Sequence, residues 1–133
     1  MAPRIVPFDR LHVDGVVGLC AAQGWSSWNP ENTAQGLSAP GVIAVVAEEA
    51  GEVLGVAELL TDGHVMAYLA LLVVAEHVRG RGIGSALIEE LFVRSGLERM
   101  DLLSEQASVA FYESMPHKSK PGYRIYKSES SLG

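Results

Sequence analysis

The chain has 133 residues, enough for one domain built around a single hydrophobic core. Its formal net charge of -6 argues against a polyanionic partner such as nucleic acid, and an acidic surface favours cationic ligands. The only cysteine, Cys20, cannot form an internal disulfide, and residues 1–8 lack the apolar core of a signal peptide. We therefore expect a reduced, cytoplasmic protein with no membrane partner, and the scattered histidines favour no metal site.

Residues 4–24 are predicted to form a strand and then a helix. Residues 4–8 have the composition of a strand, and Asp9 is suited to cap the helix that follows. Apolar side chains then recur with the spacing of one helix face, at Val13, Val16, Val17 and Cys20. Gly24 stands where a helix commonly ends. Because Cys20 falls on the apolar face, we interpret it as a small core residue rather than a nucleophile.

A second, short helix is predicted to begin at residues 29–31. Asn29 is a cap, Pro30 suits the first helical position, and Glu31 places an acid in the first turn. Trp25 and Trp28 precede this helix in a loop. Aromatic side chains in loops either contact a ligand or cover the edge of the core, and the residues alone do not decide between these roles.

An antiparallel meander is predicted next. Residues 42–48 and 53–60 form a hairpin around a tight turn at 49–52. After a turn at 62–63, the apolar run 65–75 is far too short to cross a bilayer and suits a buried strand.

The C-terminal half is predicted to alternate helices and strands. A helix over 82–95 is followed by a strand over 98–103, which should lie parallel to the strand over 65–75 because such crossovers are parallel and right-handed. A shorter helix covers 104–114, a closing strand covers 123–127, and 128–133 is a frayed tail. No repeat interrupts this order, so residues 1–133 are predicted to be one domain.

The turn between the long apolar strand and the following helix favours an anion site. It reads Arg79-Gly80-Arg81-Gly82-Ile83-Gly84. The alternate glycines expose backbone amides at the positive end of the helix, where phosphate commonly binds, and the two arginines add cationic donors. The spacing matches neither a Walker loop nor the dinucleotide motif Gly-x-Gly-x-x-Gly.

This turn resembles the acyl-CoA-binding motif of the GNAT superfamily of N-acetyltransferases, written Gln/Arg-x-x-Gly-x-Gly/Ala. The preceding apolar strand, the lead-in 76–78, residues 85–87 and the segment 111–113 also fall where that family has counterparts, so the resemblance covers nearly the whole chain. It implies an α/β (α+β) fold: a mixed central sheet with an antiparallel N-terminal meander, a splayed parallel central pair of strands, and helices on both faces.

The resemblance implies acetyl-CoA as cosubstrate, without a metal. Its pantetheine arm would bond the strand backbone at Leu72, Val73 and Val74. Its pyrophosphate would be held through main-chain amides of Arg79, Gly80, Arg81, Gly82, Ile83, Gly84 and Ser85. A bulge near Ala70 and Leu71 would direct one amide at the thioester carbonyl.

The resemblance also implies direct attack of an acceptor amine on the thioester, with Tyr112 protonating the CoA thiolate. A strand glutamate serves as base in several relatives, but Met66 stands at that position here. Glu58, Tyr68 and His64 are the remaining candidates in that order. For each candidate a purely structural role is as good a reading: Glu58 on the solvent face, Tyr68 in the core, His64 in a turn.

The region between the first two strands lines the acceptor site in the family, so Trp25, Trp28 and Glu31 are candidate acceptor contacts. The function expected is transfer of an acetyl group from acetyl-CoA to a primary amine of a small molecule or protein in a ternary complex, by a monomer or a homodimer. The alternative is an acyl-CoA-binding module with lost or regulatory activity. A nucleotide-binding regulator would need a base-specificity loop, which the sequence lacks.

Overall fold

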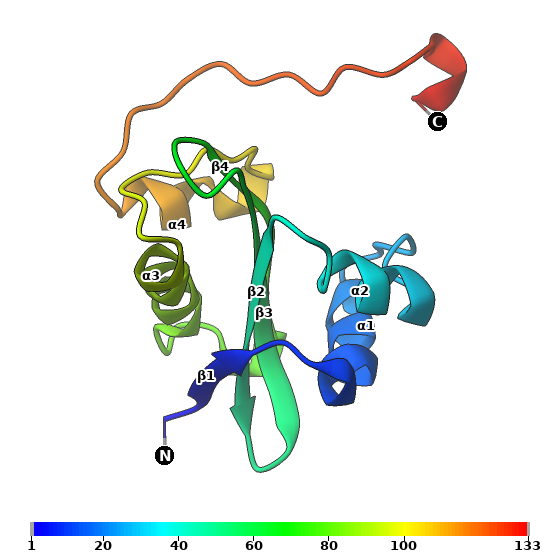
Figure 1. Cartoon of the computed structure of the whole chain (residues 1–133), viewed down its shortest axis with the longest axis vertical. Coiled ribbons are helices and arrows are strands. Elements are labelled where there is room, and N and C mark those ends of the chain that lie inside the picture. The colour runs from blue at the N-terminus through cyan, green and yellow to red at the C-terminus, as the bar shows by residue number, and fades with distance from the viewer. Residues whose placement is uncertain (1, 133) are drawn as a thin grey trace. The chain divides into compact units, whose positions relative to one another are not determined.

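The computed structural model describes residues 2–132. The chain divides into two compact units, Met1–Asp101 and Leu102–Gly133. The first unit contains a four-stranded sheet and the helices α1, α2 and α3, and the second contains α4 (Figure 1). No helix among residues 2–132 is long and apolar enough to span a bilayer.

The sheet is an antiparallel meander, as predicted. Its strands are β1 (Arg4–Pro7), β2 (Val42–Glu49), β3 (Glu52–Thr61) and β4 (Ala67–Val74), paired in that order. Each neighbouring pair is antiparallel. The turn between β2 and β3 places both Ala50 (φ 52°) and Gly51 (φ 82°) in the left-handed region, as a two-residue hairpin of the right twist requires.

The two N-terminal helices begin where the sequence predicts. The Asp9 carboxylate accepts a hydrogen bond from the amide of Leu11 (2.8 Å) and caps a 3-10 turn that leads into α1 (Val13–Ala22). Asn29 caps α2 (Pro30–Gly36) by accepting from the amide of Asn32 (2.8 Å), and Pro30 takes the first helical position. These interactions confirm the sequence signals for both helix starts.

The helix α3 (Ile83–Ser95) follows the glycine turn and ends at Gly96, whose φ is 70°. Its apolar stripe is buried, at Ile83, Leu87, Ile88 and Leu91. A methyl group added to Gly55 of β3 would lie 3.1 Å from the Leu87 side chain and 3.3 Å from that of Ile83. The absence of a side chain at Gly55 therefore lets α3 pack closely on the sheet.

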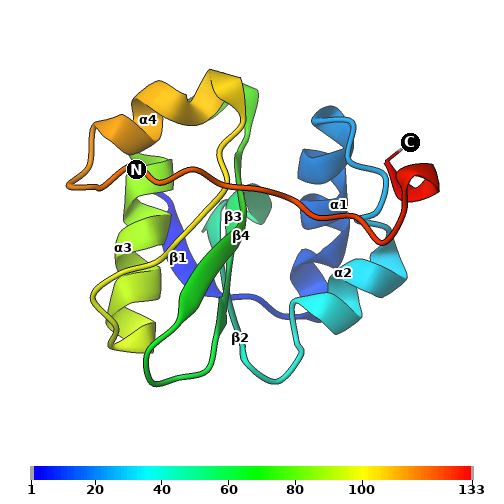
Figure 2. The same ribbon diagram turned by 90° about the horizontal axis from the view of Figure 1, so that it is seen from above.

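A hydrophobic cluster joins α1, the end of α2 and three strands. Its buried members are Val16, Cys20, Leu37, Val46, Val56, Leu71 and Val73. Figure 2 shows α1 and α2 on one side of the sheet and α3 on the other. The Cys20 thiol is fully buried, and burial raises its pKa to about 11, which agrees with a packing role.

The predicted fifth strand is reduced to one parallel bridge between Asp101 and Tyr68. The Leu69 amide donates to the Asp101 carbonyl (2.8 Å), and the Asp101 amide donates to the Ala67 carbonyl (3.0 Å). The prediction of a regular strand over 98–103 is therefore wrong, although this bridge is parallel. Charged residues flank Met100 on both sides, so the segment has no apolar run to bury on the sheet.

The second unit contains a 3-10 turn at Gln106–Ser108, α4 (Val109–Glu113) and another 3-10 turn at Glu129–Ser131. The predicted closing strand over 123–127 does not form. Tyr123 and Ile125 are 82% and 91% exposed, and residues 102–132 contain no strand that could pair with this segment. Because a strand needs a partner for its backbone groups, the alternating composition alone is insufficient.

Candidate functional site

The glycine turn lies between the end of β4 and the start of α3. Gly80 (φ 84°) and Gly82 (φ 81°) both adopt left-handed conformations, which strongly favours glycine at each position. A methyl group added to either would meet no atom within 4 Å, so the turn is open to its surroundings. Gly82 is the N-cap of α3, and its first turn has no side-chain cap. The first amides of a thirteen-residue helix therefore follow an open loop in which Gly80 and Gly82 have no side chains.

The two arginines of the turn differ in their contacts. Both side chains are exposed. The Nε of Arg79 donates a hydrogen bond to the carbonyl oxygen of Val74 (3.1 Å), at the end of β4. Arg81 makes no hydrogen bond or ion pair with any residue in 2–132. Both can attract an anion by charge, but only Arg79 has a fixed side-chain partner.

Just before the turn, no strand among residues 2–132 pairs with the outer edge of β4. The amide of Ala75 donates to the Leu54 carbonyl (2.8 Å), and so points toward β3. Backbone groups alternate in direction along an antiparallel strand, which turns those of Val73 toward β3 and those of Leu72 and Val74 outward. Of the three residues predicted to bond a cosubstrate, Leu72 and Val74 thus face the edge, where the Val74 carbonyl accepts the hydrogen bond from Arg79.

A bulge interrupts β4 near Ala70, where the sequence analysis placed one. Glu58 pairs with Leu71 while the next residue, Leu59, pairs with Leu69. Ala70 is therefore the extra residue, and it is exposed. Such a bulge redirects backbone groups out of the regular ladder, which can aim an amide at a ligand.

Glu58 of β3 is an isolated buried acid. Its side chain faces the same side of the sheet as that of Val56, which packs in the cluster with α1, because strand side chains alternate. The residue is only 6% exposed, which excludes the solvent-face reading. Among residues 2–132 it has no hydrogen-bond or salt-bridge partner, and burial raises the pKa of its carboxyl group. A buried carboxylate without a partner is costly, which makes Glu58 a candidate functional group.

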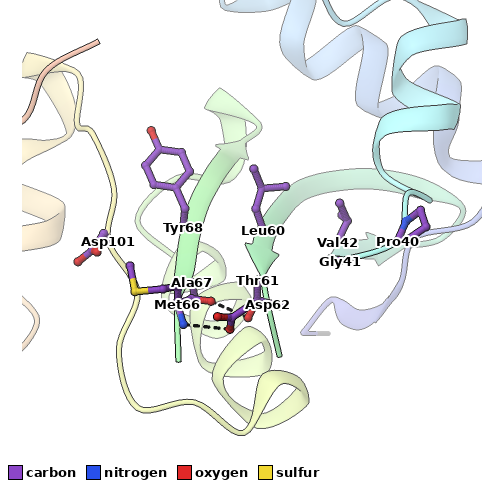
Figure 3. A pocket seen from close by; sticks show the side chains of 10 residues that line it. All are labelled: Pro40, Gly41, Val42, Leu60, Thr61, Asp62, Met66, Ala67, Tyr68 and Asp101. Atoms are coloured by element: carbon purple, nitrogen blue, oxygen red, sulfur yellow. Dashed lines mark hydrogen bonds between the residues drawn. The ribbon is translucent and has the colours of Figure 1, made fainter. Parts of the chain in front are cut away.

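Tyr68 lies on the same side of the sheet as Glu58, two cross-strand pairs away. Tyr68 pairs with Leu60 of β3, and Leu60 faces the same side as Glu58 because the two are two residues apart in one strand. Figure 3 shows the Tyr68 and Leu60 side chains pointing to the same side. Tyr68 is half-buried and lines an open hollow of about 540 Å³. The hollow is also lined by Pro40, Gly41, Val42, Leu60, Thr61, Asp62, Met66, Ala67 and Asp101.

The turn beside this hollow is held by Asp62. One oxygen of its carboxylate accepts from the amides of His64 (2.8 Å), Val65 (2.8 Å) and Met66 (3.1 Å). These bonds lower the pKa of Asp62, so it is anionic at neutral pH. His64 is exposed in this turn, which precedes β4. Its position agrees with the structural reading of His64.

The remaining candidates lie on helices or next to them. Trp25 and Trp28 are half-buried and pack against the hydrophobic cluster, so both cover the edge of the core, one of the two roles left open by the sequence. Glu31 is exposed in the first turn of α2. Tyr112 belongs to α4 of the second unit, where its ring meets Phe111 edge-on at 5.0 Å, and burial raises the pKa of its hydroxyl group.

Sequence reasoning missed the side-chain bond of Arg79 and the hollow beside Tyr68. The sequence did not indicate the hollow, because a turn at Asp62–Gly63 would pair Leu60 with Val65, whereas the structure pairs Leu60 with Tyr68. The Arg79 bond had no signal in the sequence, since an exposed arginine has many possible rotamers.

The sequence model of the acetyltransferase (GNAT) domain matches residues 40–115. A search of curated proteins gave no significant match. The ribosomal-protein-alanine N-acetyltransferase from Brucella melitensis biovar Abortus 2308 superposes with a TM-score of 0.77 and 14% identity, over 96% of this chain and 100% of that one. A GNAT family acetyltransferase from Streptococcus pneumoniae TIGR4 superposes with a TM-score of 0.75 and 24% sequence identity, over 94% of this chain and 98% of that one. AAC(6')-Iy was solved with the bisubstrate analogue CoA-S-monomethyl-acetylneamine. It superposes with a TM-score of 0.73 and 17% sequence identity, over 97% of this chain and 99% of that one.

The structural similarities concern the fold, and the sequence model covers more than half of the chain. The matched segment runs from the hollow at Pro40 through the bulged β4 and the glycine turn to the end of α4. The chain therefore belongs to the GNAT acetyltransferase family.

Proposed function

We propose that the protein is an acetyl-CoA-dependent N-acetyltransferase that transfers the acetyl group directly to a primary amine of a small molecule or protein, in a ternary complex. One observation carries this proposal: a bulged strand with an open edge leads into a glycine turn at the start of a long helix that has no side-chain cap. An extended ligand with amide groups at one end and a diphosphate at the other matches that arrangement.

The diphosphate of acetyl-CoA binds at the glycine turn in this proposal. Main-chain amides from residues 79–85 donate to its oxygens, and the helix end favours its negative charge. Farther back, the amide and carbonyl of Leu72 and the amide of Val74, which face the open edge of β4, bond the pantetheine arm, while the Val74 carbonyl keeps its bond to Arg79. The proposal also includes the splayed parallel pair of central strands that the family fold implies.

The reaction joins the amine nitrogen to the thioester carbonyl carbon through a tetrahedral intermediate. An amide at the Ala70 bulge stabilises the oxyanion, a contribution of roughly 3 kcal/mol for one such donor. The carbon–sulfur bond then breaks, the nitrogen loses one proton, and the thiolate gains one. We assign protonation of the thiolate to Tyr112.

Glu58 is the first candidate for the group that accepts the amine proton. It is buried and unpartnered, and its raised pKa brings it closer to neutrality, where a general base works best. Tyr68 ranks second because it faces the same side of the sheet beside the hollow. His64 ranks third because it is exposed in a turn outside the strand. Each acts directly or through a water molecule.

Trp25, Trp28 and Glu31 are the proposed acceptor contacts, of which only Glu31 is freely exposed. A neighbour solved with a CoA–acetylneamine analogue supports testing multi-amine acceptors first.

A turnover assay tests the proposal. Wild-type protein is incubated with acetyl-CoA and a panel of aminoglycosides, polyamines and lysine peptides, and released CoA thiol and acetylated amine are both measured. Gly82→Trp blocks the glycine turn. Gly96→Trp is the matched control, because Gly96 has a similar left-handed φ (70° against 81°) and open space at the other end of the same helix.

We expect one amine class to be acetylated by wild type and Gly96→Trp but not by Gly82→Trp. Equal turnover by the two tryptophan variants would exclude the glycine turn as the cosubstrate site. Wild-type protein that binds no acetyl-CoA would refute the proposed function.

A further inference from the structure

All three lysines of the chain lie within one stretch of ten residues. They are Lys118, Lys120 and Lys127, whereas the seven arginines are spread from Arg4 to Arg124. Lysine is the residue whose side chain ends in a primary amine, the group that the proposed function acetylates. The lysine acceptors that this chain itself contains are therefore confined to one segment.

The surrounding residues 115–128, which we call the lysine segment, differ in charge from the rest of the chain. The lysine segment contains four basic and no acidic side chains, and residues 1–114 contain 15 acidic and six basic ones. Opposite charges attract over long distances, so the acidic part of the chain favours a cationic segment of this kind as a ligand. Nothing else in the sequence combines primary amines with a local excess of positive charge.

The backbone of the lysine segment is accessible over most of its length. Residues 117–126 form no helix, strand or turn, and Figure 1 shows them as an extended trace that follows α4. The backbone of residues 118–127 makes no hydrogen bond within residues 2–132, and the three lysine side chains there are exposed and unpaired. A segment with these properties can enter an active site without first breaking bonds of its own.

The three lysines differ in their immediate surroundings. Lys118 and Lys120 have irregular backbone on both sides. Lys127 is followed closely by the 3-10 turn Glu129–Ser131, whose first residue is an acid. An acceptor that must extend through a site on both sides of its side chain is therefore better matched by Lys118 and Lys120 than by Lys127.

We propose that the protein acetylates itself, and that Lys118 and Lys120 are the modified residues. This inference rests on the proposed function and makes it more specific, because it names lysine in an irregular, acid-free segment as an acceptor.

The reaction needs no reactant beyond acetyl-CoA. The lysine ammonium first gives one proton to solvent. Its nitrogen then forms a bond to the thioester carbonyl carbon, and the carbon–sulfur bond breaks. The nitrogen loses a second proton and the thiolate gains one. The products are Nε-acetyl-lysine and CoA.

The experiment incubates the full chain with acetyl-CoA and no other amine, and measures the acetylated fraction of each lysine by peptide mass spectrometry before and during the incubation. Gly82→Trp is the matched control, because it keeps all three lysines but has a blocked glycine turn. It reports how fast exposed lysines react with acetyl-CoA without catalysis. We expect Lys118 and Lys120 of wild type to be acetylated about 100-fold faster or more than in Gly82→Trp, the contribution of positioned proton transfer alone. Lys127 should react more slowly than either.

A second variant, Lys118→Arg with Lys120→Arg, keeps both positive charges and removes both amines. It should lose nearly all acetyl incorporation while binding CoA, and acetylating an external amine, as wild type does. Unchanged incorporation in this variant would place the acceptors elsewhere and overturn the proposal.

The remaining outcomes are equally decisive. Equal acetylation in wild type and Gly82→Trp, or equal rates at all three lysines, would show uncatalysed reaction and overturn the proposal. Acetylation of an external amine without modification of Lys118 or Lys120 would overturn the inference and leave the proposed function in place. Failure of wild type to bind acetyl-CoA would overturn the proposed function and the inference with it.

Discussion

Replacing Glu58 by glutamine should make the protein more stable and less active at the same time. Glutamine has nearly the same shape but cannot ionise. Glu58 is only 6% exposed and has no bonding partner among residues 2–132, so its ionised form is poorly solvated in the folded protein. The substitution removes this unfavourable ionisation and also removes the proposed base.

The stability effect has a definite dependence on pH. Burial raises the pKa of Glu58 in the folded protein above its unfolded value of about 4.3. The protonated form is thus favoured by folding, so this contribution is fully present below the unfolded pKa and is lost as pH rises through the folded pKa. At neutral pH the loss is about 1.4 kcal/mol for each unit of pKa shift. Glu58→Gln should therefore match wild type near pH 4 and be more stable at pH 7.

The activity effect has the opposite sign. Losing a general base typically lowers the rate about 100-fold or more, and the rise of kcat with pH that reports Glu58 ionisation should disappear. Thermal unfolding and steady-state rates, each measured as a function of pH, provide the two readouts. Glu89→Gln, an exposed acid on α3, is the control and should change neither.

Three outcomes would refute this reasoning. A less stable Glu58→Gln protein at pH 7 would show that the carboxylate has favourable partners in solution. Unchanged kcat would exclude Glu58 as the base and direct attention to Tyr68. A stability difference that is the same at pH 4 and pH 7 would show that ionisation is not its cause.

Three other substitutions test separate features. Ala50→Gly should raise the free energy of unfolding by about 0.5–1 kcal/mol, measured by urea denaturation, because it relieves the left-handed strain at φ 52°; a loss of stability would contradict the turn geometry. Gly55→Val should cost about 1–3 kcal/mol and weaken CoA binding, because the new side chain would meet Leu87 and displace the start of α3; unchanged affinity would disconnect this packing from the site. Tyr112→Phe should lower kcat while leaving the dissociation constant of CoA unchanged, and full turnover would remove Tyr112 from the mechanism.

Local signals were sufficient where the chain's own neighbours decide the structure. The caps at Asp9 and Asn29, and the glycine turn at Gly80 and Gly82, each depend on groups within a few residues. The hairpins that join β2, β3 and β4 also followed from alternation and short turns, whereas β1 is connected to β2 through α1 and α2. The bulge at Ala70 came instead from the family resemblance, because a bulge depends on how a partner strand pairs.

Predictions that need a distant partner were less reliable. The segment 123–127 alternates apolar and polar residues like a strand, yet residues 102–132 offer it no strand to pair with. Asp101 forms one bridge where a full strand was expected, because Glu98, Arg99 and Asp101 itself interrupt the apolar residues of this segment. The burial of Glu58 depends on which side of the sheet α1 covers, and the Arg79 bond depends on a single rotamer. Neither can be read from spacing along the chain.

Equilibrium titration with CoA of wild type, Gly82→Trp and Gly96→Trp tests the central claim most directly, because it needs no knowledge of the acceptor. The claim is that the turn between β4 and α3 holds the diphosphate of the cosubstrate. It predicts that wild type and Gly96→Trp bind one CoA per chain with similar affinity and that Gly82→Trp, although folded, does not bind. Equal binding by Gly82→Trp, or no binding by wild type, would contradict it.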